Sequence, residues 1–278
     1  MRLRLGDAHV AWALRPFAWL AVVLPALIVV FIAAEAAPVL QLEGALAFLT
    51  DARWAPTSGV YGLGPMIAGT LLSGALALAL AAPWAIAFGL HVNLFAPRWL
   101  AIGGRAAMRL LAGVPSVVFG LLALTRLVPL LVARHPPGLG VVVSAVTLAV
   151  MILPTAALAV DAAVAQVPRE GPVAVRALGL GTWDGVRAVI LPQAAANIRA
   201  GLLLALGRAA GETMAVLMVA GNTVQYPTGP FSSFRTLTGN IAVEMSYATG
   251  LHRSALFVSA LFLLAMVLAL AVFDGRRT

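Results

Sequence analysis

The sequence lacks cysteine and lysine, and it is poor in charge of either sign. Of its 278 residues only 10% are charged, whereas soluble domains carry about 25%. Without cysteine, the chain has no disulfides, thiolate chemistry or cysteine-based metal sites. All 18 basic residues are arginine, so a phosphate-binding loop of the GxxxxGK[ST] type, which needs lysine, is also excluded. The chain therefore does not hydrolyse nucleotide by that route.

Hydrophobic residues make up 62% of the chain and the mean hydropathy is +1.01, which predicts a membrane protein. A hydrocarbon core of about 30 Å takes roughly 20 apolar residues per helix. We expect residues 1–278 to form a single, all-α, polytopic transmembrane domain. Its six apolar runs predict membrane spans at 17–37, 64–90, 107–132, 138–160, 197–222 and 251–273. The first run follows three arginines and lacks a small-residue cleavage site, so we expect a retained helix.

The arginines are distributed so that both termini are predicted to lie in the cytoplasm. In that orientation the inner segments hold twelve arginines against five acidic residues, a net charge of +7, and the outer segments are neutral. Cytoplasmic loops of membrane proteins accumulate basic residues. The formal net charge of +8 therefore reflects membrane topology and does not indicate a nucleic-acid partner. The remaining +1 comes from Arg126, Arg208 and Glu212, which fall inside predicted spans.

The inner connection at 163–195 is predicted to form a cytoplasmic helix–turn–helix. Residues 173–178 favour a short helix, Gly179 and its neighbours supply the geometry that ends it, and Thr182 is suited to cap a second helix. From Trp183 onward, apolar residues recur at helical spacing. On periodicity alone, an interfacial helix that covers the inner ends of the spans is an equal alternative.

This connection resembles the EAA loop of ABC importer permeases, whose pattern is EAA, three residues, G, nine residues, I-x-L-P. The run Ala174-Val175-Arg176-Ala177-Leu178-Gly179 is followed nine residues later by Val189-Ile190-Leu191-Pro192. Val173 stands where the family has its glutamate. The resemblance implies that residues 168–192 dock in a groove of a separate ATPase subunit, so the chain itself is not expected to be an enzyme. The expected coupling residues are Ala174, Gly179, Trp183, Leu191 and Pro192.

Two opposite charges, Arg208 and Glu212, lie near the centre of the predicted fifth span. Their spacing of four residues places them on one face of a helix. An ionised residue at that depth costs roughly 2.5–3.5 kcal/mol, and such residues are functional by default. The arginine fork can donate two hydrogen bonds to a tetrahedral oxyanion, and Glu212 could hold that fork between turnovers. The alternative is a self-neutralising pair that holds adjacent helices together.

The segment 206–222 closely resembles the signature of phosphate-uptake permeases of the PstC type, and 48–56 and 112–120 agree with it. In the partner PstA type, Gly-Glu-Thr is usually followed by Ala-Pro, whereas this chain has Met214-Ala215. The resemblance implies phosphate translocation in a bacterial inner membrane. We place the pathway at Arg208, Glu212, Thr213 and Ser116.

The same resemblance implies a heterodimer with a PstA-type permease, two copies of a cytoplasmic ATPase subunit and a periplasmic phosphate-binding protein. No cofactor is expected, and no metal site, because the four histidines are scattered without ligand spacing. Arg126 is expected to snorkel to the membrane surface, and a role in attracting substrate is the alternative. The alternatives are a permease for another oxyanion, such as arsenate, and a self-sufficient channel or secondary transporter.

Overall fold

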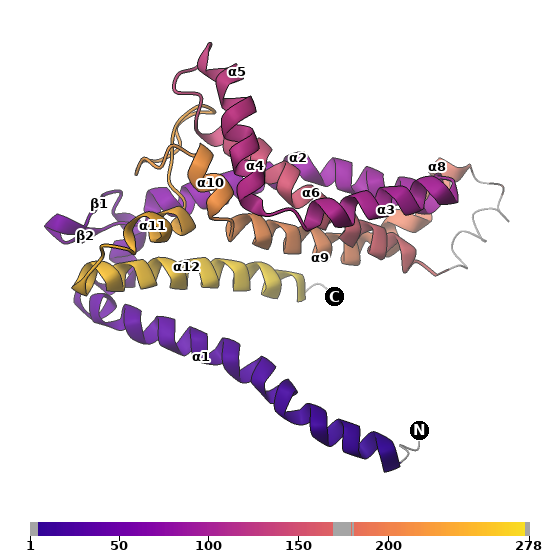
Figure 1. The fold of residues 1–278 in the computed structure, drawn as a ribbon, viewed down its shortest axis with the longest axis horizontal. Coiled ribbons are helices and arrows are strands. Elements are labelled where there is room, and N and C mark those ends of the chain that lie inside the picture. Colours follow the sequence, from indigo (N-terminus) through magenta and orange to yellow (C-terminus); the bar gives the residue numbers. More distant parts are fainter. Residues whose placement is uncertain (1–4, 169–178, 180, 276–278) are drawn as a thin grey trace.

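The computed structural model describes residues 5–168, 179 and 181–275, and this part of the chain is almost entirely helical (Figure 1). The α-helices are α1 (Leu5–Thr50), α2 (Gly64–Leu94), α3 (Arg98–Ala112), α4 (Ser116–Leu122), α5 (Val128–Val132), α6 (Val141–Ala165), α8 (Thr182–Gly185), α9 (Leu191–Ala210), α10 (Met214–Val219), α11 (Leu237–Glu244) and α12 (Gly250–Gly275). Two π-helical segments, η2 (Ala123–Leu127) and η3 (Val186–Ile190), continue α4 and α8. The predicted all-α fold class is confirmed.

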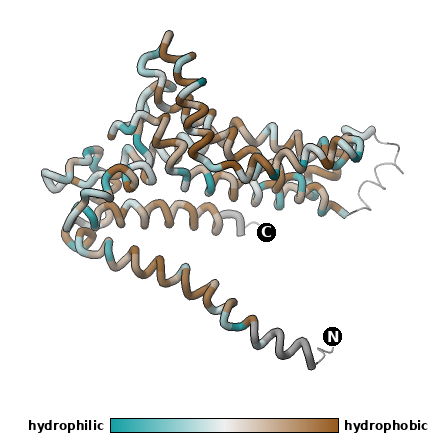
Figure 2. The backbone as a smooth tube through the Cα atoms, viewed as in Figure 1, coloured by the Kyte–Doolittle hydropathy of each residue, from teal (hydrophilic) through white to brown (hydrophobic). Residues whose placement is uncertain are grey.

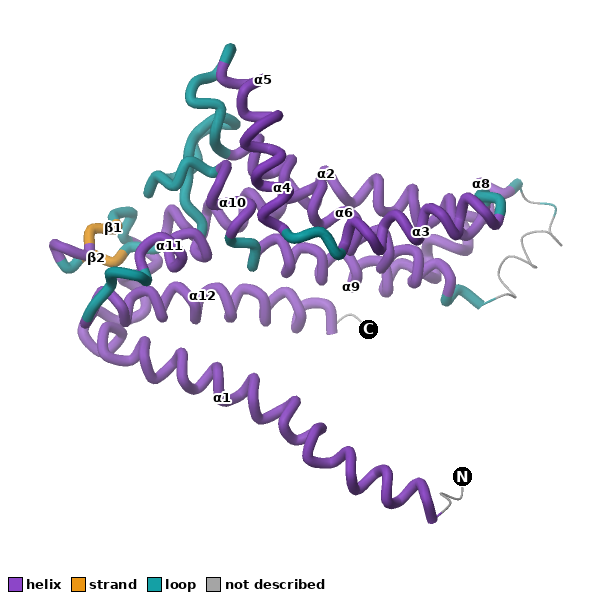
Figure 3. Tube along the Cα trace, in the orientation of Figure 1, coloured by secondary structure: helices purple, strands orange, loops and turns teal. Residues whose placement is uncertain are grey.

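A small hairpin interrupts the helices between α1 and α2. Strand β1 (Trp54–Ala55) pairs antiparallel with β2 (Val60–Tyr61), with Trp54 opposite Tyr61. The connection is a 3-10 turn, η1 (Pro56–Ser58), that ends at Gly59, whose φ of 71° is in the left-handed region that glycine adopts readily. Figure 3 shows the hairpin at the same end of the molecule as α11.

In the described part of the chain, five helical stretches are long and apolar enough to cross a membrane, and a bent pair of helices makes a sixth. The single stretches are Leu14–Leu42, Gly64–Leu94, Val141–Ala165, Thr182–Ala210 and Gly250–Val272. Helices α2, α6 and α12 begin and end within five residues of the spans predicted for them. Figure 2 shows that hydrophobic residues predominate along these helices.

The third span is not the continuous helix that was predicted over 107–132. Its two arms, Arg98–Ala112 and Ser116–Val132, meet at an angle of 89°. Pro115 lacks an amide hydrogen and disfavours helical geometry at Val114, so the helix cannot run through this point. The first arm begins at Arg98, well before the predicted span 107–132. Hydropathy missed this part of the helix because α3 is amphipathic and carries three arginines beside its apolar face.

The fifth span also differs from its prediction over 197–222. Helix α9 ends at Ala210, and residues 211–213 separate it from α10. At the inner end, the helix starts at Thr182, so the second helix predicted for the cytoplasmic helix–turn–helix is continuous with the span. Pro192 does not break the helix because the π-helical turn η3 precedes it and Pro192 occupies the first turn of α9, where its missing amide is tolerated.

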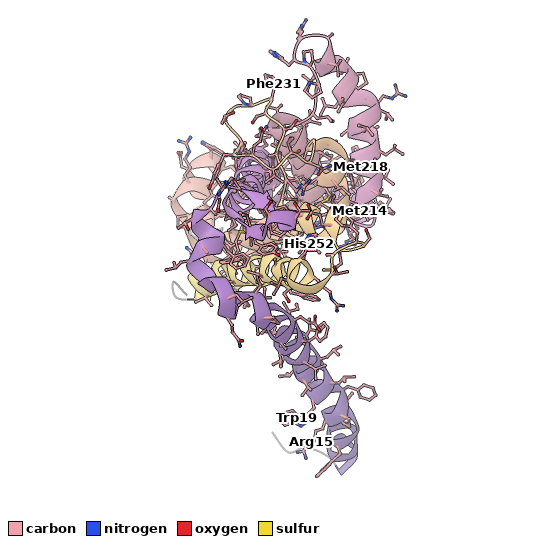
Figure 4. The ribbon with its side chains drawn as sticks, turned by 90° about the vertical axis from the view of Figure 1, so that its left-hand side faces the viewer. Arg15, Trp19, Met214, Met218, Phe231 and His252 are labelled. Carbon is pink, nitrogen blue, oxygen red and sulfur yellow. The ribbon has the colours of Figure 1, made fainter. Side chains whose placement is uncertain are left out.

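Helix α1 is much longer than the predicted span 17–37, and it leans away from the other helices (Figure 1). Gly44, with φ 71°, interrupts it near its end. Its main neighbour is α12, where Phe31 meets Phe257 edge to face at 5.8 Å between ring centroids. No part of its most apolar stretch is buried within this chain, and Figure 4 shows Arg15 and Trp19 far from the remaining helices. In the membrane, lipid or another subunit must cover this helix.

The core forms around α6, which packs between α2 and α9. Small residues allow the close approach, as is usual between membrane helices. Ala77, Ala81 and Ala85 of α2 are fully buried or nearly so. A Cβ atom on Gly89 would lie 2.6 Å from Val160 Cγ1, and one on Gly201 would lie 2.6 Å from Ala159 Cβ. Side chains larger than hydrogen are therefore excluded at these two contacts.

A polar network ties α2, α3 and α6 together. Arg105 donates from Nε to Asp161 Oδ2 and from Nη2 to Asp161 Oδ1, both at 2.8 Å. Asn93 donates to Asp161 Oδ1 at 2.8 Å. Asp161 follows the predicted span 138–160 directly, but it lies inside α6 and is buried. The bidentate pair fixes the amphipathic arm of the bent span against the core.

We expect Asp161→Asn to lower the free energy of unfolding by about 2 kcal/mol, because it leaves the Arg105 fork without its anion. The measurement is the thermal unfolding midpoint in detergent. Asp184→Asn is the matched control, since Asp184 is exposed at the inner end. Equal midpoints for the two variants would contradict the proposed role of the network.

Candidate functional site

Two helix breaks each precede one of a pair of packed helices. One separates α3 from α4 at 113–115, and the other separates α9 from α10 at 211–213; Figure 3 shows both as loop segments. Helices α4 and α10 pack closely, because a Cβ atom on Gly120 would lie 2.9 Å from both Ala215 Cα and Met218 Sδ. Ser116 opens α4 and Thr213 immediately precedes α10. Two of the four predicted pathway residues, Ser116 and Thr213, therefore lie at the starts of two packed helices, whereas Arg208 lies in α9 before the second break.

Replacing Gly120 with alanine should destabilise the protein, since the added methyl group meets backbone atoms of α10 that cannot turn aside. Gly103→Ala is the control, because nothing lies within 4 Å of a Cβ there and alanine favours a helix. We expect the thermal midpoint in detergent to fall for Gly120→Ala and to stay or rise for Gly103→Ala. A fall of equal size in both variants would argue against the close packing.

The prediction that Arg208 and Glu212 share one helix face is wrong. Helix α9 ends at Ala210, so Glu212 lies in the break. Its Oε1 accepts a hydrogen bond from the amide of Ala215 at 3.1 Å, which satisfies one of the free amides at the start of α10. Between these two described residues there is no ion pair within 4 Å. Gly211 explains the difference, because glycine ends helices more readily than it continues them.

Arg208 instead donates a hydrogen bond from Nη1 to Thr155 Oγ1 of α6, at 2.7 Å. Its guanidinium opens on a groove of about 550 Å³. Apart from Arg208 and Thr155, the lining is apolar or glycine: Ala200, Leu203, Leu204, Gly207, Val267, Leu270 and Ala271. Among the described residues, no acidic side chain lines this groove. The arrangement is a cation without a counter-ion in an apolar cleft between α6, α9 and α12, which suits a passing anion.

A second polar cluster, at the end of the molecule that holds the hairpin, was not expected from the sequence. Glu244, buried at the end of α11, accepts hydrogen bonds from Trp54 Nε1 at 2.7 Å and from Arg235 Nη1 at 2.6 Å. His252 Nε2 lies 2.9 Å from Glu244 Oε2. These residues come from the hairpin, the segment before α11 and the first turn of α12. The one sign of this ion pairing in the sequence was that the predicted outer segments hold equal numbers of basic and acidic residues.

Helix α11 connects this outer cluster to the break in the fifth span. At its start, Thr238 Oγ1 donates to the backbone carbonyl of Glu212 at 2.8 Å. Thr70 of α2 accepts a hydrogen bond from the amide of Leu237 at 3.0 Å. At its end, Glu244 binds the hairpin through Trp54. A short helix thus links the hairpin to the backbone of Glu212, a predicted pathway residue. Hydropathy did not reveal this helix, because its eight residues are too few to span a membrane.

Arg126 lies on the π-helical segment η2 and is exposed. It borders a small pocket of about 140 Å³ between this segment and α6. That Arg126 snorkels to the membrane surface stays a prediction.

Three of the expected coupling residues, Trp183, Leu191 and Pro192, lie in the first part of the helical stretch Thr182–Ala210. Gly179 has φ 67°, and a Cβ atom there would meet no other atom within 4 Å. Glycine therefore suits this position because of its left-handed backbone conformation and not because of a close neighbour. Trp183 is exposed, with the Arg187 guanidinium 5.0 Å from its ring centroid. Leu191 is half-buried and Pro192 exposed. Ala174 lies outside the described residues.

Residues 81–276 match the family described as "Binding-protein-dependent transport system inner membrane component". The chain belongs to this family. It is a multi-pass inner-membrane protein and the permease subunit of a binding-protein-dependent ABC transporter. The transporter's ATPase is a separate subunit, so the chain is not an enzyme, and the family implies ATPase and binding-protein partners.

Several curated proteins are similar over most of the chain. The probable ABC transporter permease protein YqgH of Bacillus subtilis is 34% identical over 240 residues, which cover 83% of this chain and 78% of that protein. The phosphate transport system permease protein PstC of Mesorhizobium japonicum is 32% identical over 247 residues, with 81% and 74% covered. PstC of Haemophilus influenzae is 32% identical over 237 residues, with 78% and 75% covered.

Among solved structures, a chain of the MetNI methionine ABC transporter in an inward-facing conformation aligns with a TM-score of 0.58. The alignment covers 81% of this chain and 97% of that chain, at 19% sequence identity. At this identity the likeness shows the fold alone. The fold is therefore that of a type I ABC importer permease.

Proposed function

We propose that the chain translocates inorganic phosphate across the bacterial inner membrane. The observation that carries the proposal is Arg208, a membrane-embedded cation that faces an apolar groove without an acidic neighbour among the described residues. Its planar fork matches two oxygens of a phosphate group. A single arginine gives a weak site, which suits a conduit in which release matters more than affinity. The PstC name of two similar proteins supports phosphate as the substrate.

We propose a PstA-type permease as the second subunit, facing the Arg208 groove. The guanidinium is exposed in the single chain, and leaving it in lipid would cost roughly 2.5–3.5 kcal/mol. A second permease subunit across the groove would enclose a polar pathway between the two chains. The whole assembly would then contain two ATPase copies and a periplasmic phosphate-binding protein. The charge of +7 on the inner segments supports cytoplasmic termini.

The loop at 168–192 is proposed to contact the ATPase through Gly179, Trp183, Leu191, Pro192 and the undescribed Ala174. The helical stretch that begins at Thr182 runs without a gap to Ala210. At 1.5 Å per residue it spans about 40 Å, so a displacement at the inner end reaches Arg208 directly. ATP binding would favour one of two arrangements of this helix, as in alternating access. Family membership leaves no support for the self-sufficient channel or secondary transporter, whereas another oxyanion stays an alternative.

Arg208→Gln should abolish ATP-dependent phosphate uptake, because the neutral amide cannot attract the anion. The test uses the complete transporter in proteoliposomes, with radiolabelled phosphate and with copurification of all subunits to verify assembly. Arg126→Gln is the matched control and should keep uptake close to that of the natural protein, since Arg126 is expected to snorkel. Normal uptake by an assembled Arg208→Gln transporter would refute the assigned role.

Gly179→Val should uncouple ATP hydrolysis from transport, because a branched side chain at φ 67° is strained by roughly 1–2 kcal/mol and distorts the turn. Gly181→Val is the control, since Gly181 has an extended backbone that valine adopts. The measurement is the number of phosphate ions transported per ATP hydrolysed. If Gly179→Val retained both stimulated hydrolysis and full uptake, the coupling role would be wrong.

A further inference from the structure

We propose that Thr155 of α6 is a second contact for the transported oxyanion, beside Arg208. The inference rests on the proposed function and adds a residue that the sequence did not single out. Thr155 lies at the polar part of the groove, where its Oγ1 accepts a hydrogen bond from Arg208 Nη1 at 2.7 Å. The other described residues of the lining offer no side-chain donor or acceptor. A desolvated anion in this cleft therefore finds its side-chain hydrogen bonds at these two residues.

The hydroxyl of Thr155 is used differently from those of Thr70, Thr125 and Thr147, which also lie within helices. Thr70, Thr125 and Thr147 each donate to the carbonyl four residues earlier, at 2.8, 2.7 and 2.7 Å. That bond is the usual one for threonine in a membrane helix. Within the described part of the chain, Thr155 has no such bond and its one hydrogen-bond partner is Arg208. Since its oxygen is the acceptor there, its proton remains free to donate to a ligand.

Thr155 also takes the role that was expected of Glu212, which is to hold the arginine fork when no substrate is present. A neutral hydroxyl binds the guanidinium less strongly than a carboxylate would. An arriving phosphate can therefore take the guanidinium hydrogen bonds from Thr155. The hydroxyl oxygen is then free to accept a hydrogen bond from a P–OH group, while its own proton can be donated to a phosphoryl oxygen. Because none of the described lining residues is acidic, no fixed negative charge among them opposes the anion.

The test compares three variants of the complete transporter in proteoliposomes. Thr155→Val removes the hydroxyl and keeps the branched shape, whereas Thr155→Ser keeps the hydroxyl. Thr147→Val makes the same change in the same helix, at a threonine whose hydroxyl is bonded to its own helix. We expect Thr155→Val to lower phosphate uptake per ATP hydrolysed by roughly tenfold or more, while copurification of the subunits is unchanged. Thr155→Ser and Thr147→Val should both stay within about twofold of the natural protein.

Three outcomes would overturn the inference. Full uptake by Thr155→Val shows that the hydroxyl is dispensable. Equal loss in Thr155→Val and Thr155→Ser shows that the hydroxyl is not what matters, and equal loss in Thr147→Val shows a general effect of altering α6. Arg208→Gln, measured in parallel, separates this inference from the proposed function. If that variant alone loses uptake, phosphate transport through the groove stands and the role of Thr155 fails.

Discussion

The charge of Arg208 is the constraint on which the rest of the structure depends. A guanidinium in the membrane-spanning part must face a partner, water or an anion, because lipid cannot solvate it. In this chain its one protein partner among the described residues is the neutral hydroxyl of Thr155. The described lining of the surrounding groove is apolar and free of acidic side chains. The single chain thus leaves the positive charge of Arg208 without a counter-ion among the described residues of this face. A second permease subunit would cover the groove, and a passing oxyanion would supply the negative charge.

The helix breaks place backbone polar groups inside the spans of a chain that is otherwise rich in apolar residues. Helices α4 and α10 each begin after an interruption and pack tightly through Gly120. Helix α11 ties the second interruption to the outer hairpin, through Thr238 at one end and Glu244 at the other. At the inner end, an unbroken helical stretch leads from Thr182 to Arg208. Contacts from both membrane faces therefore converge on the region of Arg208 and Glu212.

Hydropathy was sufficient to predict the all-α fold, and the ends of α2, α6 and α12 closely, because long apolar runs have few other solutions in a membrane. It did not predict that Pro115 bends the third span or that Gly211 ends α9, since neither interrupts the apolar pattern. The pairing of Arg208 with Glu212 was predicted from helical spacing. It is wrong because α9 ends at Ala210, between the two residues. The contacts of Thr155 with Arg208 and of Glu244 with Trp54 join residues distant in sequence, and no local pattern encodes them.

The absence of cysteine makes the central claim directly measurable. A single cysteine introduced by Leu204→Cys would stand in the groove beside Arg208, because Leu204 is an exposed part of its lining. The measurement is its labelling, in the assembled transporter, by a membrane-impermeant, water-soluble thiol reagent. If the groove is an aqueous anion pathway, the thiol reacts and phosphate slows the reaction during ATP-driven transport. Labelling only by a lipid-soluble reagent, with no effect of phosphate, would show that the groove faces lipid and contradict the account.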